Sequence, residues 1–236
     1  MMAACKSNEA FEMVGVAQSS TAFTTHRALL LNADYRPMGS PLLTLDGEEL
    51  VRRLLAETVV PVKWSEVWAR SPSFEMRLPS VVALTKYSPN QTPEDVPPCN
   101  LANLYERENG RDAYKRRRKV SLKGRSPAQQ ASIDHIVPAF YGGEINWDNV
   151  ALAAQDWNSK RGHDQRKGKK GEGDRRLNVL VYTPTYGNLM AFKNARSPEP
   201  AEWQEFLQPL TPKHGPAAEM WQEHRAMDAY VAGLER

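Results

Sequence analysis

The chain has 236 residues, of which 41% are apolar and 25% charged, and its formal net charge is +3. This length suits one mid-sized domain or two small ones with enough apolar side chains for a core. Because the chain has no apolar run as long as a membrane span, no secretory signal and only two cysteines, we expect a cytoplasmic protein without a disulfide framework and without a membrane partner.

Residues 1–25 are expected to form a disordered lead-in, and residues 26–100 a small α+β unit with a linker. Apolar runs predict strands over residues 27–32, 59–63 and 80–84. Pro61 favours an edge position for the second strand, because proline donates no ladder hydrogen bond. Between the first two strands, Asp46 is expected to cap a helix together with Glu49. A linker rich in Pro, Asn and Asp follows from Tyr87.

Residues 101–170 are expected to form the second unit, which opens with a short helix over residues 101–108. A strand is predicted over 131–137, where β-branched residues surround a polar pair and Pro138 stops the ladder. Gly142 and Gly143 then supply a turn. A short apolar strand over 150–154 and a helix over 154–161 complete the order strand, loop, strand, helix.

The candidate catalytic and metal-binding residues lie in this second unit. Asp134 and His135 are near the end of the strand predicted over residues 131–137. Imidazole titrates near neutral pH, so His135 is suited to take a proton from water. Asp134 and Asn158 offer the hard oxygen ligands that magnesium and manganese prefer. Asn149 is expected to hydrogen-bond loop backbone and so to orient His135. Since adjacent strand residues point to opposite faces, the Asp-His pair acts together only where the strand leaves ideal geometry.

The same stretch resembles the motif of HNH endonucleases, also called the ββα-metal or His-Me finger. The residues that carry the resemblance are Asp134, His135, Pro138, Gly142, Gly143, Trp147, Asn149, Asn158 and Lys160. The resemblance implies DNA cleavage with one Mg²⁺ or Mn²⁺ ion, metal ligands at Asp134 and Asn158, and a general base at His135. It implies that Asn149 orients the loop. It covers about residues 26–165, because the stretches RALLLNADYRPM and RLPSVVAL resemble the segment that precedes the motif in many phage and bacterial members.

The sequence departs from that family in two places. Many members hold a structural zinc ion with two cysteine pairs, and this chain has no cysteine at either place. We therefore expect no structural zinc, and we expect Tyr114 and Trp157 to replace that cross-link by packing. The loop AFYGG also lacks the Ser-Arg that often precedes the glycine pair, which would weaken or change contact with DNA.

Basic residues are concentrated on both sides of the motif. Residues 111–125 contain eight Lys or Arg and one Asp, and residues 160–176 contain eight Lys or Arg and three acidic residues. Such runs favour a polyanion-binding surface, because Lys and Arg displace phosphate counterions, although solvated loops also carry them. The residues expected to contact nucleic acid are Arg116, Arg117, Arg118, Lys119, Lys160, Arg161 and His163.

Residues 171–236 are expected to form an extension made of a hairpin and helices. The hairpin is predicted from two apolar runs, 177–182 and 189–192, and a helix is predicted after Pro200. The last helix, over 216–234, has an apolar stripe that favours core packing, with a dimer seam as the alternative. His224 in this stripe is expected to be a packed histidine rather than a ligand.

The sequence thus predicts an α+β protein with a small N-terminal α+β unit, a ββα-metal core and a C-terminal hairpin-plus-helices extension. The expected function is metal-dependent hydrolysis of DNA phosphodiester bonds, with a homodimer as one way to cut both strands. Two alternatives stay open. One is a catalytically inactive nucleic-acid-binding protein with the same fold, and the other is a protein that binds or cleaves RNA.

Overall fold

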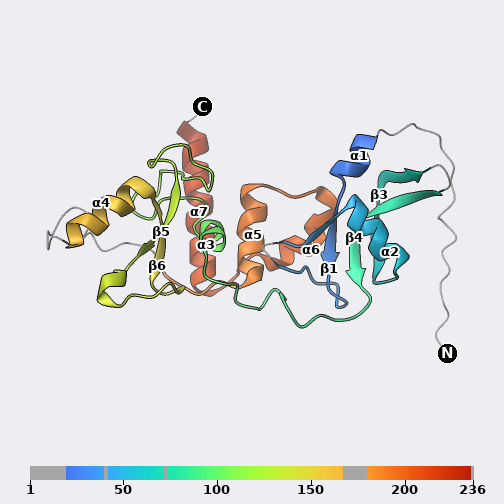
Figure 1. Ribbon diagram of the computed structural model, residues 1–236, viewed down its shortest axis with the longest axis horizontal. Helices are drawn as coiled ribbons and strands as arrows, with labels where there is room; N and C mark the ends of the chain where they lie inside the picture. Colours follow the sequence, from blue (N-terminus) through green and yellow to red (C-terminus); the bar gives the residue numbers. More distant parts are fainter. Residues whose placement is uncertain (1–19, 40–41, 72–73, 167–179, 235–236) are drawn as a thin grey trace.

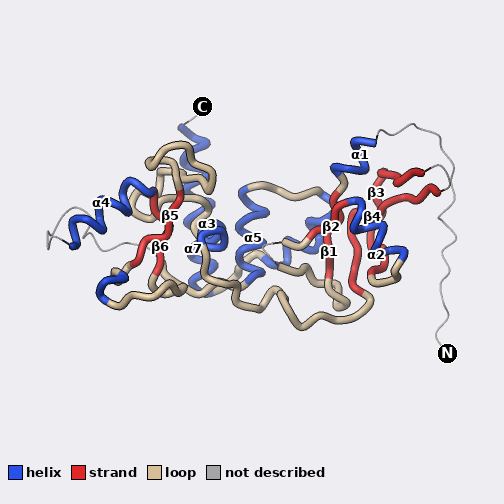
Figure 2. Tube along the Cα trace, viewed as in Figure 1, coloured by secondary structure: helices blue, strands red, loops and turns tan. Residues whose placement is uncertain are grey.

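The computed structural model describes residues 20–39, 42–71, 74–166 and 180–234. Its mixed helices and strands form two units at opposite ends of the longest axis, with helix α5 between them (Figure 1). A four-stranded sheet builds the N-terminal unit and a two-stranded sheet builds the other (Figure 2). None of the helices in the described ranges combines the length and apolarity needed to cross a lipid bilayer.

The N-terminal sheet has the strand order β2-β1-β4-β3. Its strands are β1 (Arg27–Leu31), β2 (Thr44–Asp46), β3 (Val59–Ser71) and β4 (Phe74–Leu84). Strand β1 pairs antiparallel with β2 and parallel with β4, and β3 and β4 form a long antiparallel pair. Pro61 lies in the edge strand β3, as predicted. Both β3 and β4 extend beyond their predicted bounds. The added residues mix apolar and polar side chains, so they form no unbroken apolar run that would predict a strand.

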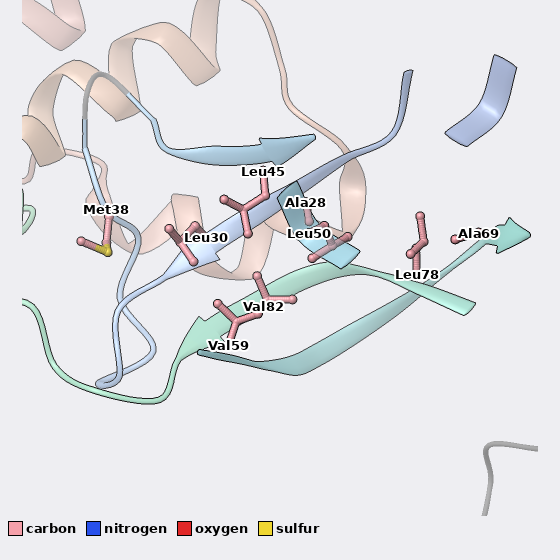
Figure 3. Packing of buried hydrophobic residues seen from close by; sticks show 9 residues of the cluster. All are labelled: Ala28, Leu30, Met38, Leu45, Leu50, Val59, Ala69, Leu78 and Val82. Atoms are coloured by element: carbon pink, nitrogen blue, oxygen red, sulfur yellow. The ribbon is translucent and has the colours of Figure 1, made fainter. Parts of the chain in front are cut away.

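Helix α2 (Gly47–Leu55) covers one face of this sheet and begins at the predicted cap, where the Asp46 side chain accepts a hydrogen bond of 2.9 Å from the Glu49 amide. Leu50 of α2 is fully buried in the apolar cluster shown in Figure 3. Helix α1 (Ser20–Thr25) adds Phe23 to that cluster. The last part of the predicted disordered lead-in is therefore helical, and residues 1–19 lie outside the described ranges.

The opposite face of the sheet is covered by the C-terminal part of the chain. Tyr186 and Met190 of α5 (Tyr186–Arg196) pack on it, together with Trp203 of the 3₁₀ helix η3 (Ala201–Trp203) and Leu207 of α6 (Gln204–Leu207). A further 3₁₀ turn, η4 (Gln208–Leu210), follows α6. Because successive strand residues point to opposite faces, β1 is buried on both sides and appears in the sequence as the unbroken apolar run ALLL.

The predicted C-terminal hairpin is wrong for residues 189–192, which lie within α5. Thr185 caps this helix, since its side chain accepts from the Asn188 amide while the Asn188 side chain accepts from the Thr185 amide. A short apolar run such as LMAF fits a strand or a buried helix equally well, so periodicity could not separate them. Residues 177–179 of the other predicted strand lie outside the described ranges.

The second unit has the predicted order of strand, loop, strand and helix. Its elements are α3 (Leu101–Arg107), β5 (Ala131–His135), the 3₁₀ turn η1 (Ala139–Tyr141), β6 (Val150–Ala154) and α4 (Gln155–Arg166). Strands β5 and β6 pair antiparallel over their full length. Helix α3 packs beside this sheet, and the long helix α7 (Gly215–Leu234) belongs to the same end of the molecule (Figure 1).

Helix α7 is joined to the second unit by burial and by ion pairs. Met220 and His224 are buried, and the His224 ring meets the Phe192 ring edge-on, with 5.1 Å between the ring centroids. His224 is therefore packed inside the protein, as predicted, and burial lowers its pKa to about 3. Asp228 pairs with Arg111. The apolar stripe is not buried to its end, because Leu234 is exposed.

Arg107 is fully buried and joins three parts of the chain. Its guanidinium donates to the carbonyl oxygens of Trp147 (2.9 Å), Val150 (2.8 Å) and Tyr182 (3.0 Å), and pairs with Glu108 at 3.0 Å. A guanidinium tolerates burial only when its donors are satisfied. The end of α3, the start of β6 and the segment before α5 are therefore held around one side chain.

Replacing Arg107 by Met removes these donors while keeping a long side chain. We expect the free energy of unfolding to fall by about 3–5 kcal/mol, because a buried pair and several carbonyl hydrogen bonds are lost. Chemical denaturation followed by circular dichroism measures this. Arg52→Met is the control: Arg52 is exposed and pairs with Glu48 on α2, so its loss should cost about 1 kcal/mol or less. Equal losses in the two variants would contradict the role given to Arg107.

Candidate functional site

The site lies where β5 ends, at the start of the β5–β6 loop (residues 136–149). The side chain of Asn149 holds this loop closed. Its amide oxygen accepts from the Val137 amide at 2.7 Å, and its amide nitrogen donates to the carbonyl oxygens of Val137 (3.1 Å) and Glu144 (2.9 Å). These are contacts to loop backbone of the kind that the sequence analysis expects of Asn149.

The two turn glycines are needed for different reasons. Gly142 has a φ of +85°, a left-handed conformation that disfavours residues with a side chain. Gly143 approaches Val137 so closely that an added Cβ would lie 1.8 Å from the Val137 carbonyl oxygen. The loop therefore folds tightly over its own first residues, directly after His135.

Asp134 is buried between two hydrogen-bond donors. Its Oδ1 accepts from Arg161 Nη1 at 2.8 Å, and its Oδ2 accepts from the hydroxyl of Tyr114. Burial raises the pKa of Asp134, and the Tyr114 and Arg161 donors oppose that rise because they stabilise the carboxylate. Burial and the nearby Asp134 charge raise the pKa of Tyr114, which keeps the phenol protonated as a donor.

Arg161 of α4 points into the protein rather than into solvent. Besides Asp134, its guanidinium donates to the carbonyl oxygens of His135 (2.6 Å) and Ile136 (3.2 Å). The residue is only 8% exposed. The nucleic-acid contact predicted for Arg161 is therefore not available in this arrangement, in which the guanidinium neutralises Asp134 and holds the end of β5.

Asn158 attaches α4 to β5. Its amide nitrogen donates to the Ser132 hydroxyl (3.1 Å) and to the Ile133 carbonyl oxygen (2.8 Å). Asn158 and Arg161 are three residues apart and share one face of the helix, and Ser132 and Asp134 share one face of the strand. The structure thus brings both predicted metal ligands, Asp134 and Asn158, to the interface between β5 and α4.

His135 is the last residue of β5 and pairs with Val150 of β6. It is half-buried, whereas Asp134 beside it is buried. Strand alternation directs the two side chains to different faces. One further ladder hydrogen bond, from the Ile136 amide to the Asn149 carbonyl oxygen at 2.9 Å, precedes the loop, so the strand keeps regular pairing up to the imidazole.

The oxygen atoms near Asp134 suit a hard cation, and a cationic group already lies among them. Arg161 Nη1 is within hydrogen-bond distance of an Asp134 carboxylate oxygen and of the His135 carbonyl oxygen. A divalent ion bound to the same carboxylate oxygen would face that guanidinium at close range, so it fits only if Arg161 moves away. Within the described ranges, no three His, Cys, Asp or Glu side chains gather into a metal-binding group.

Tyr114 and Trp157 pack together, as predicted, with 5.7 Å between their ring centroids. Lys115 and Lys160 lie over the Trp157 ring at 5.3 and 5.5 Å from its centroid. This cluster attaches α4 to the basic segment that precedes β5. Sequence reasoning found the packing but missed that the Tyr114 hydroxyl binds Asp134, because no local pattern links positions 114 and 134.

Much of the basic segment 111–119 makes contacts within the protein, including two residues for which a nucleic-acid contact is predicted. Arg116 pairs with Glu108 and Glu223, and Arg118 pairs with Asp156 at 2.9 Å. Arg117 lies over the ring of Tyr230 of α7, 4.5 Å from its centroid. Arg116 and Arg118 therefore join α3, α4 and α7 in this structure.

The cations that remain at the surface are partly different from those predicted. Arg117, Lys119, Lys160 and His163 are exposed. Lys119 also lines an open pocket of about 380 Å³ together with Lys123 and Arg125. Lys123 and Arg125 belong to the basic run but are not among the predicted contacts, because a count of charges does not show which side chains line a pocket.

Comparison with known proteins gives no match to any family model, any curated protein or any solved structure. What the chain does is therefore inferred from its own residues and their arrangement.

Replacing Asn149 by Ala tests the clamp on the β5–β6 loop. We expect amides of residues 136–144 to exchange hydrogen faster, because the Val137 amide loses its acceptor, while β6 stays protected. Hydrogen–deuterium exchange with mass spectrometry measures this. The matched control is Asn146→Ala, an exposed asparagine in the same loop that accepts one bond of 3.2 Å from the Asp148 amide. If both variants exchange as the wild type does, Asn149 does not hold the loop.

Proposed function

We propose that this chain is an HNH-type endonuclease that hydrolyses DNA phosphodiester bonds with one Mg²⁺ or Mn²⁺ ion. The observation that carries the proposal is the β5–β6–α4 unit. In it, Asp134 and Asn158 share the interface between β5 and α4, and His135 stands immediately before a loop that Asn149 closes. An imidazole, a carboxylate and an amide oxygen around one strand end are the groups that metal-assisted phosphodiester hydrolysis requires. Because strand alternation directs His135 and Asp134 to different faces, the mechanism requires the imidazole to turn toward the Asp134 side at the end of β5.

In this mechanism His135 accepts a proton from the attacking water. The water oxygen forms a bond to phosphorus, and the bond from phosphorus to the 3′-oxygen breaks. The leaving 3′-oxygen takes a proton from solvent water, so the products carry a 5′-phosphate and a 3′-hydroxyl. Asn149 fixes the loop so that the imidazole keeps its orientation. Asp134 and Asn158 would hold the ion, whose chemistry is to stabilise charge on the phosphate and on the leaving oxygen.

Surface charge supports DNA as the substrate. Lys119, Lys123 and Arg125 border one pocket, and Lys160 and His163 lie on α4. Such side chains neutralise backbone phosphates without reading sequence. With one site per chain, each turnover cuts one strand. Cleavage of both strands then requires a homodimer or two successive events.

A second candidate function is nucleic-acid binding without catalysis, and one observation favours it. The positive charge that a buried Asp134 needs is already supplied by Arg161. A chain that keeps this pair closed would retain the fold and the surface cations but would not hold an ion at Asp134. The two candidates differ in whether binding is followed by cleavage.

Supercoiled plasmid incubated with the purified chain and Mg²⁺ or Mn²⁺ tests the proposal. We expect relaxed or linear DNA with metal, none with EDTA, and a loss of at least about a hundredfold in His135→Ala, since a general base contributes about 10²–10⁴ in rate. His214→Ala, an exposed histidine before α7, is the matched control and should cut as the wild type does.

Two results would decide against the proposal. Cleavage that survives in His135→Ala at the wild-type rate would remove the general base from the mechanism. A wild type that is inert with both metals yet shifts DNA on a gel would establish the binding function instead.

A further inference from the structure

The β5–β6 loop displays an apolar surface at the edge of the molecule. Four large apolar residues of the loop are exposed: Val137 by 49%, Phe140 by 49%, Tyr141 by 70% and Ile145 by 54%. We call these four residues the loop patch. The loop is the yellow-green segment at the lower left of Figure 1, outside the sheet formed by β5 and β6. Large apolar side chains that are exposed together in one short loop are a candidate binding surface.

The backbone keeps the loop patch exposed. The Pro138 carbonyl oxygen accepts from the Tyr141 amide at 2.9 Å and from the Gly143 amide at 3.2 Å, and Asn149 fixes Val137. The apolar core of this unit is formed by other residues, among them Leu104, Trp147 and Leu152, and includes none of the four. The rings of Phe140 and Tyr141 pack on each other instead, with 4.2 Å between their centroids.

The loop patch lies close to the proposed chemistry. Phe140 follows His135 by five residues, so its Cα lies within about 18 Å of the His135 Cα even for a fully extended chain. One nucleic-acid strand advances about 3.4 Å per nucleotide. A strand whose phosphate is at His135 and which runs toward the loop reaches the loop patch within about five nucleotides.

The charge of the loop indicates which part of a nucleic acid it meets. Residues 136–149 contain no Lys or Arg, and they contain two acidic residues, Glu144 and Asp148. Such a loop has no cation with which to bind phosphates, in contrast to the basic pocket at Lys119 and to α4. Aromatic rings do stack on bases, and this stacking tolerates any sequence because every base has a π-face. Paired bases inside a continuous duplex are not accessible to such stacking.

From this combination we infer that Phe140 and Tyr141 stack on unpaired bases beside the cleaved phosphodiester, so that single-stranded or locally unpaired DNA is the preferred substrate. The inference rests on the proposed nuclease function, since that function is what brings nucleic acid to His135. The inferred substrate differs from continuous duplex DNA, whose paired bases would not contact the rings and whose phosphates would find no cation in this loop.

Binding in EDTA tests the inference without requiring cleavage. The probes are a 12-nucleotide single strand containing 2-aminopurine and the duplex of the same sequence, each titrated with the full-length chain. We expect Phe140→Leu and Tyr141→Leu to weaken single-strand binding by about fivefold to hundredfold each, the range that base–aromatic stacking supplies. Duplex binding should change less than twofold. The 2-aminopurine fluorescence that the wild type quenches should recover in both variants.

Two control variants separate stacking from loss of apolar surface and from general damage. Tyr141→Phe keeps the ring and should bind as the wild type does, whereas leucine keeps apolar area without a ring. Tyr87→Leu removes an aromatic residue that is 57% exposed in the linker and should have no effect. Circular dichroism checks that each variant is folded.

Three results would overturn the inference: unchanged single-strand binding in both leucine variants, an equal loss for duplex, or a wild-type dimer that the leucine substitutions dissociate without changing DNA affinity. The last result would assign the loop patch to contacts between copies of the chain.

Failure of the nuclease proposal is distinguishable from failure of this inference. A chain that stacks on bases in EDTA but never cuts with metal would support the inference and contradict the nuclease proposal. If the leucine variants change neither plasmid cleavage nor single-strand binding, the nuclease proposal stands and the inference on base stacking fails.

Discussion

The buried guanidinium of Arg107 is the constraint on which the arrangement of the second unit depends. It donates hydrogen bonds to the carbonyl oxygens of Trp147 in the β5–β6 loop and Val150 in β6. A third goes to the carbonyl oxygen of Tyr182, which lies 75 residues after Arg107. A buried cation with unsatisfied donors would be costly, so α3, β6 and the segment leading to α5 have to assemble together. Glu108 extends the network to Arg116, and Arg116 extends it to Glu223 on α7.

This network explains why the C-terminal residues do not form a separate extension. Helix α5 closes one face of the N-terminal sheet through Tyr186 and Met190, while Phe192 of the same helix packs against α7. The N-terminal sheet and the ββα unit therefore share α5. Ion pairs of α7 with Arg111 and Arg116 complete the second unit, which is why arginines that resemble a DNA-binding run are partly internal.

Local patterns in the sequence were enough to predict some of these elements. The apolar runs at 27–31, 131–135 and 150–154 are strands, and the Asp46 cap and the Gly142–Gly143 turn are where their chemistry requires them. Each of these depends on neighbours within a few residues. The apolar run before Asn32 predicts a strand, but it does not identify α5 as an element that covers it.

Contacts between distant residues could not be predicted in this way. Arg116 meets Glu223 across 107 residues, and Tyr114 meets Asp134 across 20. Arg161 was assigned to phosphate because a basic residue on a helix is usually solvated, whereas a carboxylate buried 27 residues earlier recruits it. The short run LMAF fits a strand by its composition. It is helical because it packs on both sides, and that packing is not visible in the sequence. The sequence shows which residues are charged or apolar, but it does not show which distant residues they contact.

The central claim is that this site adds water to phosphorus and releases the 3′-oxygen. The most direct measurement is cleavage of DNA in ¹⁸O-labelled water, with mass spectrometry of the new ends. The account predicts one ¹⁸O atom on a 5′-phosphate and an unlabelled 3′-hydroxyl, in a reaction that stops in EDTA. A 3′-phosphate end, or a cut that incorporates no solvent oxygen, would contradict it.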